Sequence, residues 1–85
     1  MATKKTPAVK ISLDFGDSIV KATGATVYEA LSALVRPTKI TGKVFLEARN
    51  GTRAVKQMYM PVRAKRLFYP QAQLYIAKQL EHLMR

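Results

Sequence analysis

The sequence contains no cysteine, no tryptophan, one histidine and only five acidic residues among its 85 residues. The lack of cysteine excludes a disulfide framework, a thiolate nucleophile and a cysteine-based zinc site. One histidine and five scattered acids do not supply a closed metal site, so we expect neither a metal nor another cofactor. His82 lies near the end of a predicted helix, where a histidine interacts favourably with the helix dipole.

Catalytic motifs are also missing from the sequence. Asp14 and Asp17 stand three residues apart, but they flank a predicted turn in which aspartate has a structural use. Gly24 precedes a helix start, as glycines of phosphate-binding loops do, yet the spacing and the lysine of such loops are absent. A plain connector between strand and helix is the better interpretation. We therefore predict that the protein is not an enzyme.

Long hydrophobic runs are absent too. No stretch approaches the roughly 18 apolar residues that a membrane span needs, and residues 1–7 lead into no apolar core of a signal peptide. We expect an intracellular (cytoplasmic) or virion location and no membrane partner. Because so short a chain has a small core, a homo-oligomer or a larger assembly would help to stabilise it.

The N-terminal part predicts a flexible arm and then a hairpin. Residues 1–8 are basic and show no periodicity, so we expect an arm that precedes a single domain over residues 9–85. Apolar and polar residues alternate over 9–15, as in a half-buried strand. Gly16-Asp17 suits a two-residue type II′ turn. In that register Lys21 points outward beside Ser12.

A helix should follow this first hairpin. Thr26 and Glu29 have the spacing of a capping box, in which each side chain bonds a free backbone amide of the first turn. Pro37 should end the helix near Val35. One apolar stripe then contains Val27, Leu31, Leu34 and Val35.

A second hairpin is predicted around Asn50-Gly51, a strong signal for a two-residue type I′ turn. That turn would pair Leu46 with Val55, whereas a longer, bulged turn would move the faces of the returning strand by one residue. With the short turn, the core side contains Val44, Leu46, Val55 and Tyr59. The other side contains Lys43, Phe45, Glu47, Arg49, Lys56, Met58 and Met60.

The remaining sequence predicts a connector or strand extension over residues 62–69, and then a helix that Pro70 opens. The apolar stripe of this helix contains Ala72, Ile76, Leu80, Leu83 and Met84. The order is therefore ββαββα. This order predicts an α+β fold, a two-layer sandwich in which an antiparallel sheet of two hairpins packs against two helices.

Positive charge is concentrated in the second half of the chain. The net charge is +10, and residues 36–66 carry nine Lys and Arg against one acid, Glu47, a net of +8. Such a surplus favours polyanionic partners. We predict a small basic module that binds the phosphate backbone of nucleic acid, DNA or RNA, through its second hairpin. The predicted phosphate contacts are Lys43, Arg49, Arg53, Lys56, Arg63, Lys65 and Arg66.

Phe45 is the predicted stacking partner for a base, because exposed aromatics among cations suit unpaired bases. In the alternative interpretation, Phe45 and Met58 pack beneath a helix as part of the core. Two other functions use the same features. The protein could be a structural or assembly component of a virion or a large nucleoprotein particle, or an inhibitor that docks on an acidic protein surface.

Overall fold

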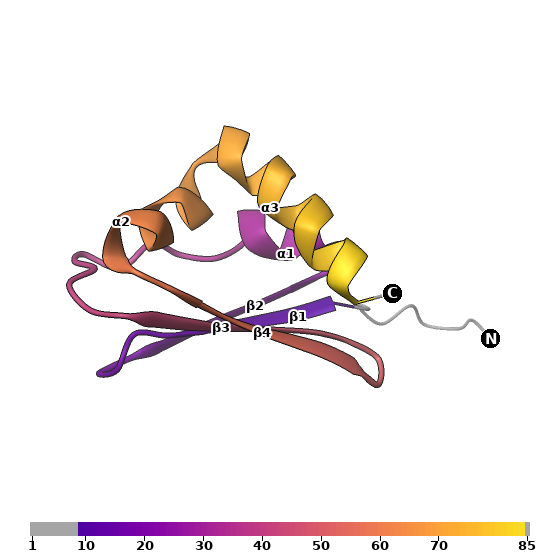
Figure 1. Ribbon diagram of the computed structural model, residues 1–85, viewed down its shortest axis with the longest axis horizontal. Coiled ribbons are helices and arrows are strands. Elements are labelled where there is room, and N and C mark those ends of the chain that lie inside the picture. The colour runs from indigo at the N-terminus through magenta and orange to yellow at the C-terminus, as the bar shows by residue number, and fades with distance from the viewer. Residues whose placement is uncertain (1–8, 85) are drawn as a thin grey trace.

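The computed structural model describes residues 9–84 and shows two layers, a four-stranded antiparallel sheet and a layer of helices on one of its faces (Figure 1). The predicted α+β sandwich is confirmed, whereas the predicted arm at residues 1–8 lies outside the described residues. The elements in chain order are β1 Val9–Asp14, β2 Ile19–Gly24, α1 Val27–Ser32, β3 Val44–Asn50, β4 Arg53–Tyr59, α2 Pro61–Ala64, the 3₁₀ helix η1 Lys65–Phe68 and α3 Pro70–Leu83.

The two hairpins join into one sheet through β1 and β3, which pair antiparallel in the strand order β2-β1-β3-β4. The first hairpin has the predicted register, with Ser12 opposite Lys21. Its turn is Gly16-Asp17, closed by the Phe15 amide, which donates to the Ser18 carbonyl at 2.9 Å. Gly16 has a φ of +98°, which glycine adopts without a steric penalty.

The second hairpin turns one residue later than predicted. Asn50 pairs with Arg53, and the two turn residues are Gly51 and Thr52. A type I′ turn at Asn50-Gly51 would need a positive φ at both residues, whereas here only Gly51 has one, of +66°. Each β3 residue therefore pairs with a β4 residue two positions later than predicted, so Leu46 faces Gln57 instead of Val55. A shift of two residues keeps every side chain on its predicted face of the sheet.

Helix α1 begins as predicted and ends early. The Glu29 amide donates to Thr26 Oγ1 at 3.1 Å, which is the predicted N-cap bond. The Glu29 carboxylate accepts from the Ala25 amide at 3.1 Å, one residue before the N-cap, instead of from the Thr26 amide that a capping box uses. The helix ends at Ser32, with Ala33 as its C-cap. Leu34 is still buried, but Val35 is 72% exposed, so its predicted place in the core is wrong. Beyond the helix end the side chains no longer follow the helical period.

Residues 62–69 form a helical connector rather than a strand extension. Pro61 is the first residue of α2 and Pro70 the first of α3, where the missing amide of proline costs no intrahelical bond. Ile76 and Leu80 of α3 and its C-cap residue Met84 are buried as predicted. Leu83 is 52% exposed, which corrects its predicted place in the stripe.

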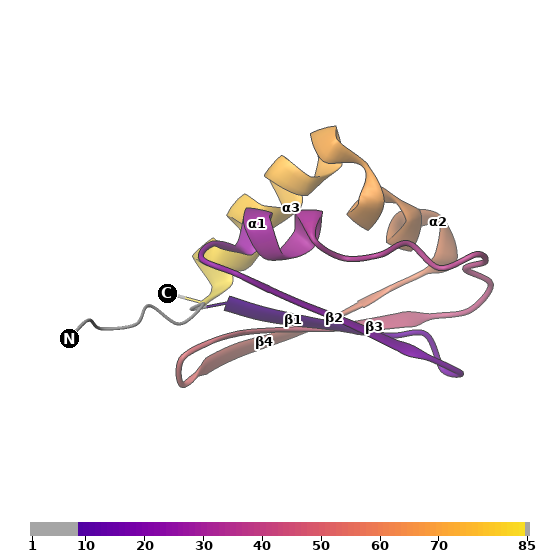
Figure 2. The ribbon, with the colours of Figure 1, turned by 180° about the vertical axis from the view of Figure 1, so that it is seen from behind.

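The core lies between the helices and one face of the sheet. It is built mainly from alternate residues of the two central strands and from the buried sides of α1, η1 and α3. Among residues 9–84, no element covers the opposite face of the sheet, as the view from behind also shows (Figure 2). The largest fully buried side chains are those of Ile11, Leu13, Leu31, Leu46, Leu67, Leu80, Val27 and Val44.

One buried polar side chain, Gln73, ties three helical segments together. Its side-chain amide donates to the carbonyls of Leu67 at 2.8 Å and Leu31 at 3.3 Å. Its Oε1 accepts from Ser32 Oγ at 3.4 Å. Gln73 is only 6% exposed, so these bonds replace the water that its amide would otherwise bind.

We expect the Gln73→Met substitution, which keeps the size but removes the amide, to lower the free energy of unfolding by about 1–2 kcal/mol. The Leu67 carbonyl would lose this buried donor, whereas the Leu31 carbonyl still accepts from the Leu34 amide. Urea denaturation followed by circular dichroism measures the change. Gln71→Met, at an exposed position of the same helix, is the control. Equal stability of the two variants would contradict this role of Gln73.

Candidate nucleic-acid interface

The uncovered face of the sheet, called here the outer face, has three rows of side chains that cross all four strands. They follow from the pairing of β2 with β1, β1 with β3 and β3 with β4. The row nearest the start of β3 contains Ile19, Asp14, Phe45 and Met58. The middle row contains Lys21, Ser12, Glu47 and Lys56, and the third contains Thr23, Lys10, Arg49 and Ala54.

The middle and third rows form a basic half of the outer face, consisting of Lys10, Lys21, Arg49 and Lys56. All four are exposed. Glu47 lies among them and accepts from the Arg49 guanidinium at 3.1 Å. It also lies directly opposite Lys56. The Arg49–Glu47 pair is largely solvent-exposed, so it stabilises little, and three cations of this half have no ion pair in the described structure.

A second group of cations lies where β4 leads into α2. Val44 pairs with Tyr59, so Lys43, just before β3, lies at the same end of the sheet as Met60 and the start of α2. Residues 33–43 connect α1 to β3, and Gln73 holds the end of α1 near η1 by bonding both Leu31 and Leu67. Both ends of this loop are therefore anchored next to the segment 60–69, and both views place the loop and α2 at the same end of the molecule (Figures 1 and 2).

We call this group the basic end. It contains six exposed cations, three from the loop and three from α2 and η1, namely Arg36, Lys39, Lys43, Arg63, Lys65 and Arg66. Neither residues 33–43 nor residues 60–69 include an acid. Asp17, in the β1–β2 turn, lies at the same end of the sheet. Within residues 9–84 none of the six cations forms an ion pair, because Arg49–Glu47 is the one pair found there.

Arg53 lies apart from both groups. Its guanidinium donates to the Met84 carbonyl at 2.9 Å. That carbonyl follows α3 and has no intrahelical partner, so Arg53 satisfies a free acceptor at a helix end. This contact gives Arg53 a structural role in holding α3 to β4.

The predicted site residues are therefore divided between surfaces. Phe45, Arg49 and Lys56 share the outer face as predicted, whereas Lys43, Arg63, Lys65 and Arg66 belong to the basic end. Lys10 and Lys21, which the prediction did not include, join the outer face because β1 pairs with β3. Alternation along the first hairpin predicts that both lysines face outward. Only the pairing of β1 with β3 shows that they lie on the same face as Arg49 and Lys56.

Phe45 lies on the outer face and is 54% exposed, so the alternative that it packs beneath a helix is wrong. An open hollow of about 540 Å³ lies beside it. Ile19 and Met58 supply further apolar lining, and Ser12, Asp14, Glu47, Lys56 and Gln57 supply polar lining. Asp14 Oδ1 accepts from the Gly16 amide at 2.8 Å, so this carboxylate takes part in the β1–β2 turn.

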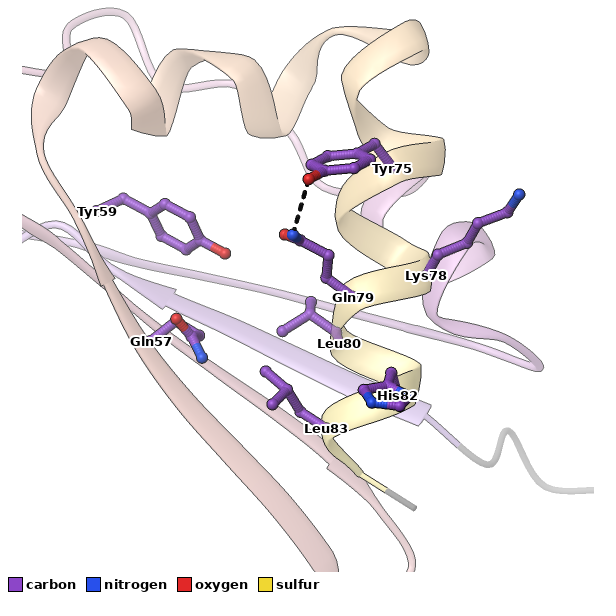
Figure 3. Close-up of a pocket in the computed structure, with 8 residues that line it drawn as sticks. All are labelled: Gln57, Tyr59, Tyr75, Lys78, Gln79, Leu80, His82 and Leu83. Atoms are coloured by element: carbon purple, nitrogen blue, oxygen red, sulfur yellow. Dashed lines mark hydrogen bonds between the residues drawn. The ribbon is translucent and has the colours of Figure 1, made fainter.

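A second open hollow, of about 500 Å³, lies on the opposite side of the sheet between the edge strand β4 and α3 (Figure 3). Tyr59, Leu80 and Leu83 point into it, whereas Lys78 points away. Burial raises the pKa of the Tyr59 phenol above its ordinary value of 10.0. Most of the surface that lines this hollow is apolar. The lining residues are Gln57, Tyr59, Tyr75, Lys78, Gln79, Leu80, His82 and Leu83.

Residues 9–84 show neither a cluster of metal ligands nor a membrane-spanning helix. No three His, Asp or Glu side chains gather where they could hold a metal ion. None of the helices described is long and apolar enough to cross a bilayer. A comparison with known protein families, curated proteins and solved structures finds no significant match to this chain.

Proposed function

We propose that the protein is a nucleic-acid-binding module that contacts the phosphate backbone through the basic end and the basic half of the outer face. The observation that carries this proposal is the basic end, where two segments distant in sequence bring six exposed cations together. Unpaired cations on a fixed surface attract a polyanion and release its counterions on binding. Half of the six are arginines, whose planar guanidinium matches the geometry of phosphate.

The outer face extends this surface beyond the basic end. Phe45 and Met58 lie two residues along the chain from Lys43 and Met60, so apolar and basic side chains adjoin there. The cations would also attract an acidic protein surface. The exposed aromatic next to them is the feature that favours a nucleic acid, because every base offers a face for stacking.

A second candidate function is a structural part of a larger assembly, and the hollow beside β4 favours it. β4 is an edge strand, whose free backbone groups can pair with another chain. Next to it, α3 exposes Tyr75 and Leu83, at 65% and 52%. A stable oligomer seen by light scattering without nucleic acid would favour this candidate over the first.

The proposed function predicts a steep salt dependence of binding. For six neutralised phosphates, we expect log Kd to rise with log salt at a slope of about 4–5, roughly a thousandfold loss of affinity between roughly 50 and 200 mM salt. Fluorescence anisotropy with labelled DNA and RNA of mixed sequence measures this slope. Absence of binding at the lowest salt, or an affinity that salt does not change, would contradict the proposal.

A further inference from the structure

The hollow beside Phe45 has the wrong charge for a phosphate. Two acids, Asp14 and Glu47, line it against one cation, Lys56, and Asp14 lies directly across from Phe45 on the neighbouring strand. Two carboxylates repel an anion, while the exposed ring of Phe45 and the side chains of Ile19 and Met58 offer apolar surface. The hollow therefore suits an uncharged, flat group rather than the backbone of a nucleic acid.

Cations lie on both sides of this hollow along the strand direction. On one side, two residues before Phe45, Lys43 begins the basic end. On the other side, the next row contains Lys21 and Lys56, and the row after it Lys10 and Arg49. Two residues of a strand span about 7 Å, so a group at Phe45 has long cationic side chains within reach on both flanks.

A hollow with an exposed aromatic ring therefore lies between two groups of cations, and an unpaired strand likewise has a base between two phosphates. We propose that the protein binds single-stranded nucleic acid, with one base stacked on Phe45 in the hollow and the phosphates on either side held by the basic end and the basic half. This inference rests on the proposed function and specifies its ligand. A base inside a duplex is stacked on both faces and cannot enter the hollow.

The shape of the sheet supports this choice of ligand. Within residues 9–84 nothing covers the outer face of the four strands, which span about 14 Å at about 4.8 Å between neighbours. An uncovered sheet with an exposed aromatic can accept bases that are splayed out from a single strand. A duplex would reach only the cations on the flanks, so it should bind through charge alone.

The test compares Phe45→Leu, which keeps an apolar side chain but removes the ring, with the unaltered protein. Anisotropy titrations use a fluorescein-labelled single strand of mixed sequence and a hairpin duplex of equal charge, both at low salt. We expect Phe45→Leu to weaken single-strand binding by roughly tenfold and to leave duplex binding unchanged. The unaltered protein should prefer the single strand by a similar factor.

Tyr75→Leu is the matched control, because Tyr75 is an exposed aromatic on the helical side. It should change neither affinity. Equal affinity of the unaltered protein for both ligands, together with an unchanged Phe45→Leu variant, would overturn this inference while leaving the proposed function intact. A protein that is a dimer by light scattering and becomes a monomer with Phe45→Leu would also overturn it. Failure to bind either ligand would refute the proposed function itself.

Discussion

Gly24→Ala should lower the free energy of unfolding by about 3 kcal/mol, a cost typical of severe overpacking. A Cβ atom at Gly24 would lie 2.7 Å from the Ala30 amide nitrogen, 2.8 Å from Glu29 Cβ and 3.0 Å from the Glu29 carbonyl carbon. Two of these three atoms are backbone, so no rotamer change relieves the contact. The last residue of β2 and the first turn of α1 would have to separate.

Such a separation would affect more than one contact. The Ala30 amide donates to the Thr26 carbonyl in the first turn of α1, and Ala30 itself is fully buried. Moving the helix outward would therefore loosen the packing of Val27 and Leu31 over the sheet. For a domain of this size the loss corresponds to a fall in Tm on the order of 15 °C.

Gly42→Ala provides the matched control for this prediction. A Cβ atom at Gly42 would meet nothing within 4 Å, and its φ lies outside the left-handed region. The stability of this variant should therefore stay within about 0.5 kcal/mol of the parent. Thermal and urea denaturation of the two variants measure the difference in their stability. A Gly24→Ala protein as stable as Gly42→Ala would show that β2 and α1 do not pack as described.

Removing three cations of the basic end should have the largest effect on binding. We expect the triple variant Arg63→Gln, Lys65→Gln and Arg66→Gln to reduce the salt slope by about 2–3 and to weaken binding on the order of a hundredfold at about 0.1 M salt. All three side chains are exposed, so the fold should remain stable within about 0.5 kcal/mol. Anisotropy titrations over a salt series measure both quantities.

A comparison of single variants separates a located site from the effect of net charge. Arg66→Gln and Lys78→Gln each remove one charge from an exposed helical position, but Lys78 lies on α3, outside both basic groups. Arg66→Gln should lower the salt slope by about one, while Lys78→Gln should leave it unchanged. Equal losses in the two variants would mean that overall charge, rather than the basic end, attracts the nucleic acid.

Local signals in the sequence were sufficient for much of the fold. The turn at Gly16-Asp17, the Thr26 N-cap and the helix start at Pro70 were predicted correctly, because each depends on residues that are close together in the sequence. The second hairpin turn was misplaced by one residue. Its faces were still right, since alternation along β3 depends on burial and not on the type of turn.

The errors have a common physical cause. Val35 and Leu83 were assigned to the core by spacing alone, yet both are largely exposed. Periodicity identifies the apolar side of a helix. It does not show where the helix ends or how far the surface that covers this side extends. Gln73 is the opposite case, a polar residue that is buried. Its side-chain amide bonds the carbonyls of Leu31 and Leu67, which only the tertiary fold brings close together.

By itself, the sequence determined the order of strands and helices, the faces of the hairpins and the surplus of positive charge, because these follow from neighbouring residues. Only the tertiary structure decided that β1 pairs with β3, which places Lys10 and Lys21 beside Arg49 and Lys56. In the tertiary structure the loop 33–43 and the segment 60–69 also lie together as the basic end, and Arg53 donates to the Met84 carbonyl at the end of α3. Contacts between distant segments depend on how the layers pack, and local residue patterns do not specify that packing.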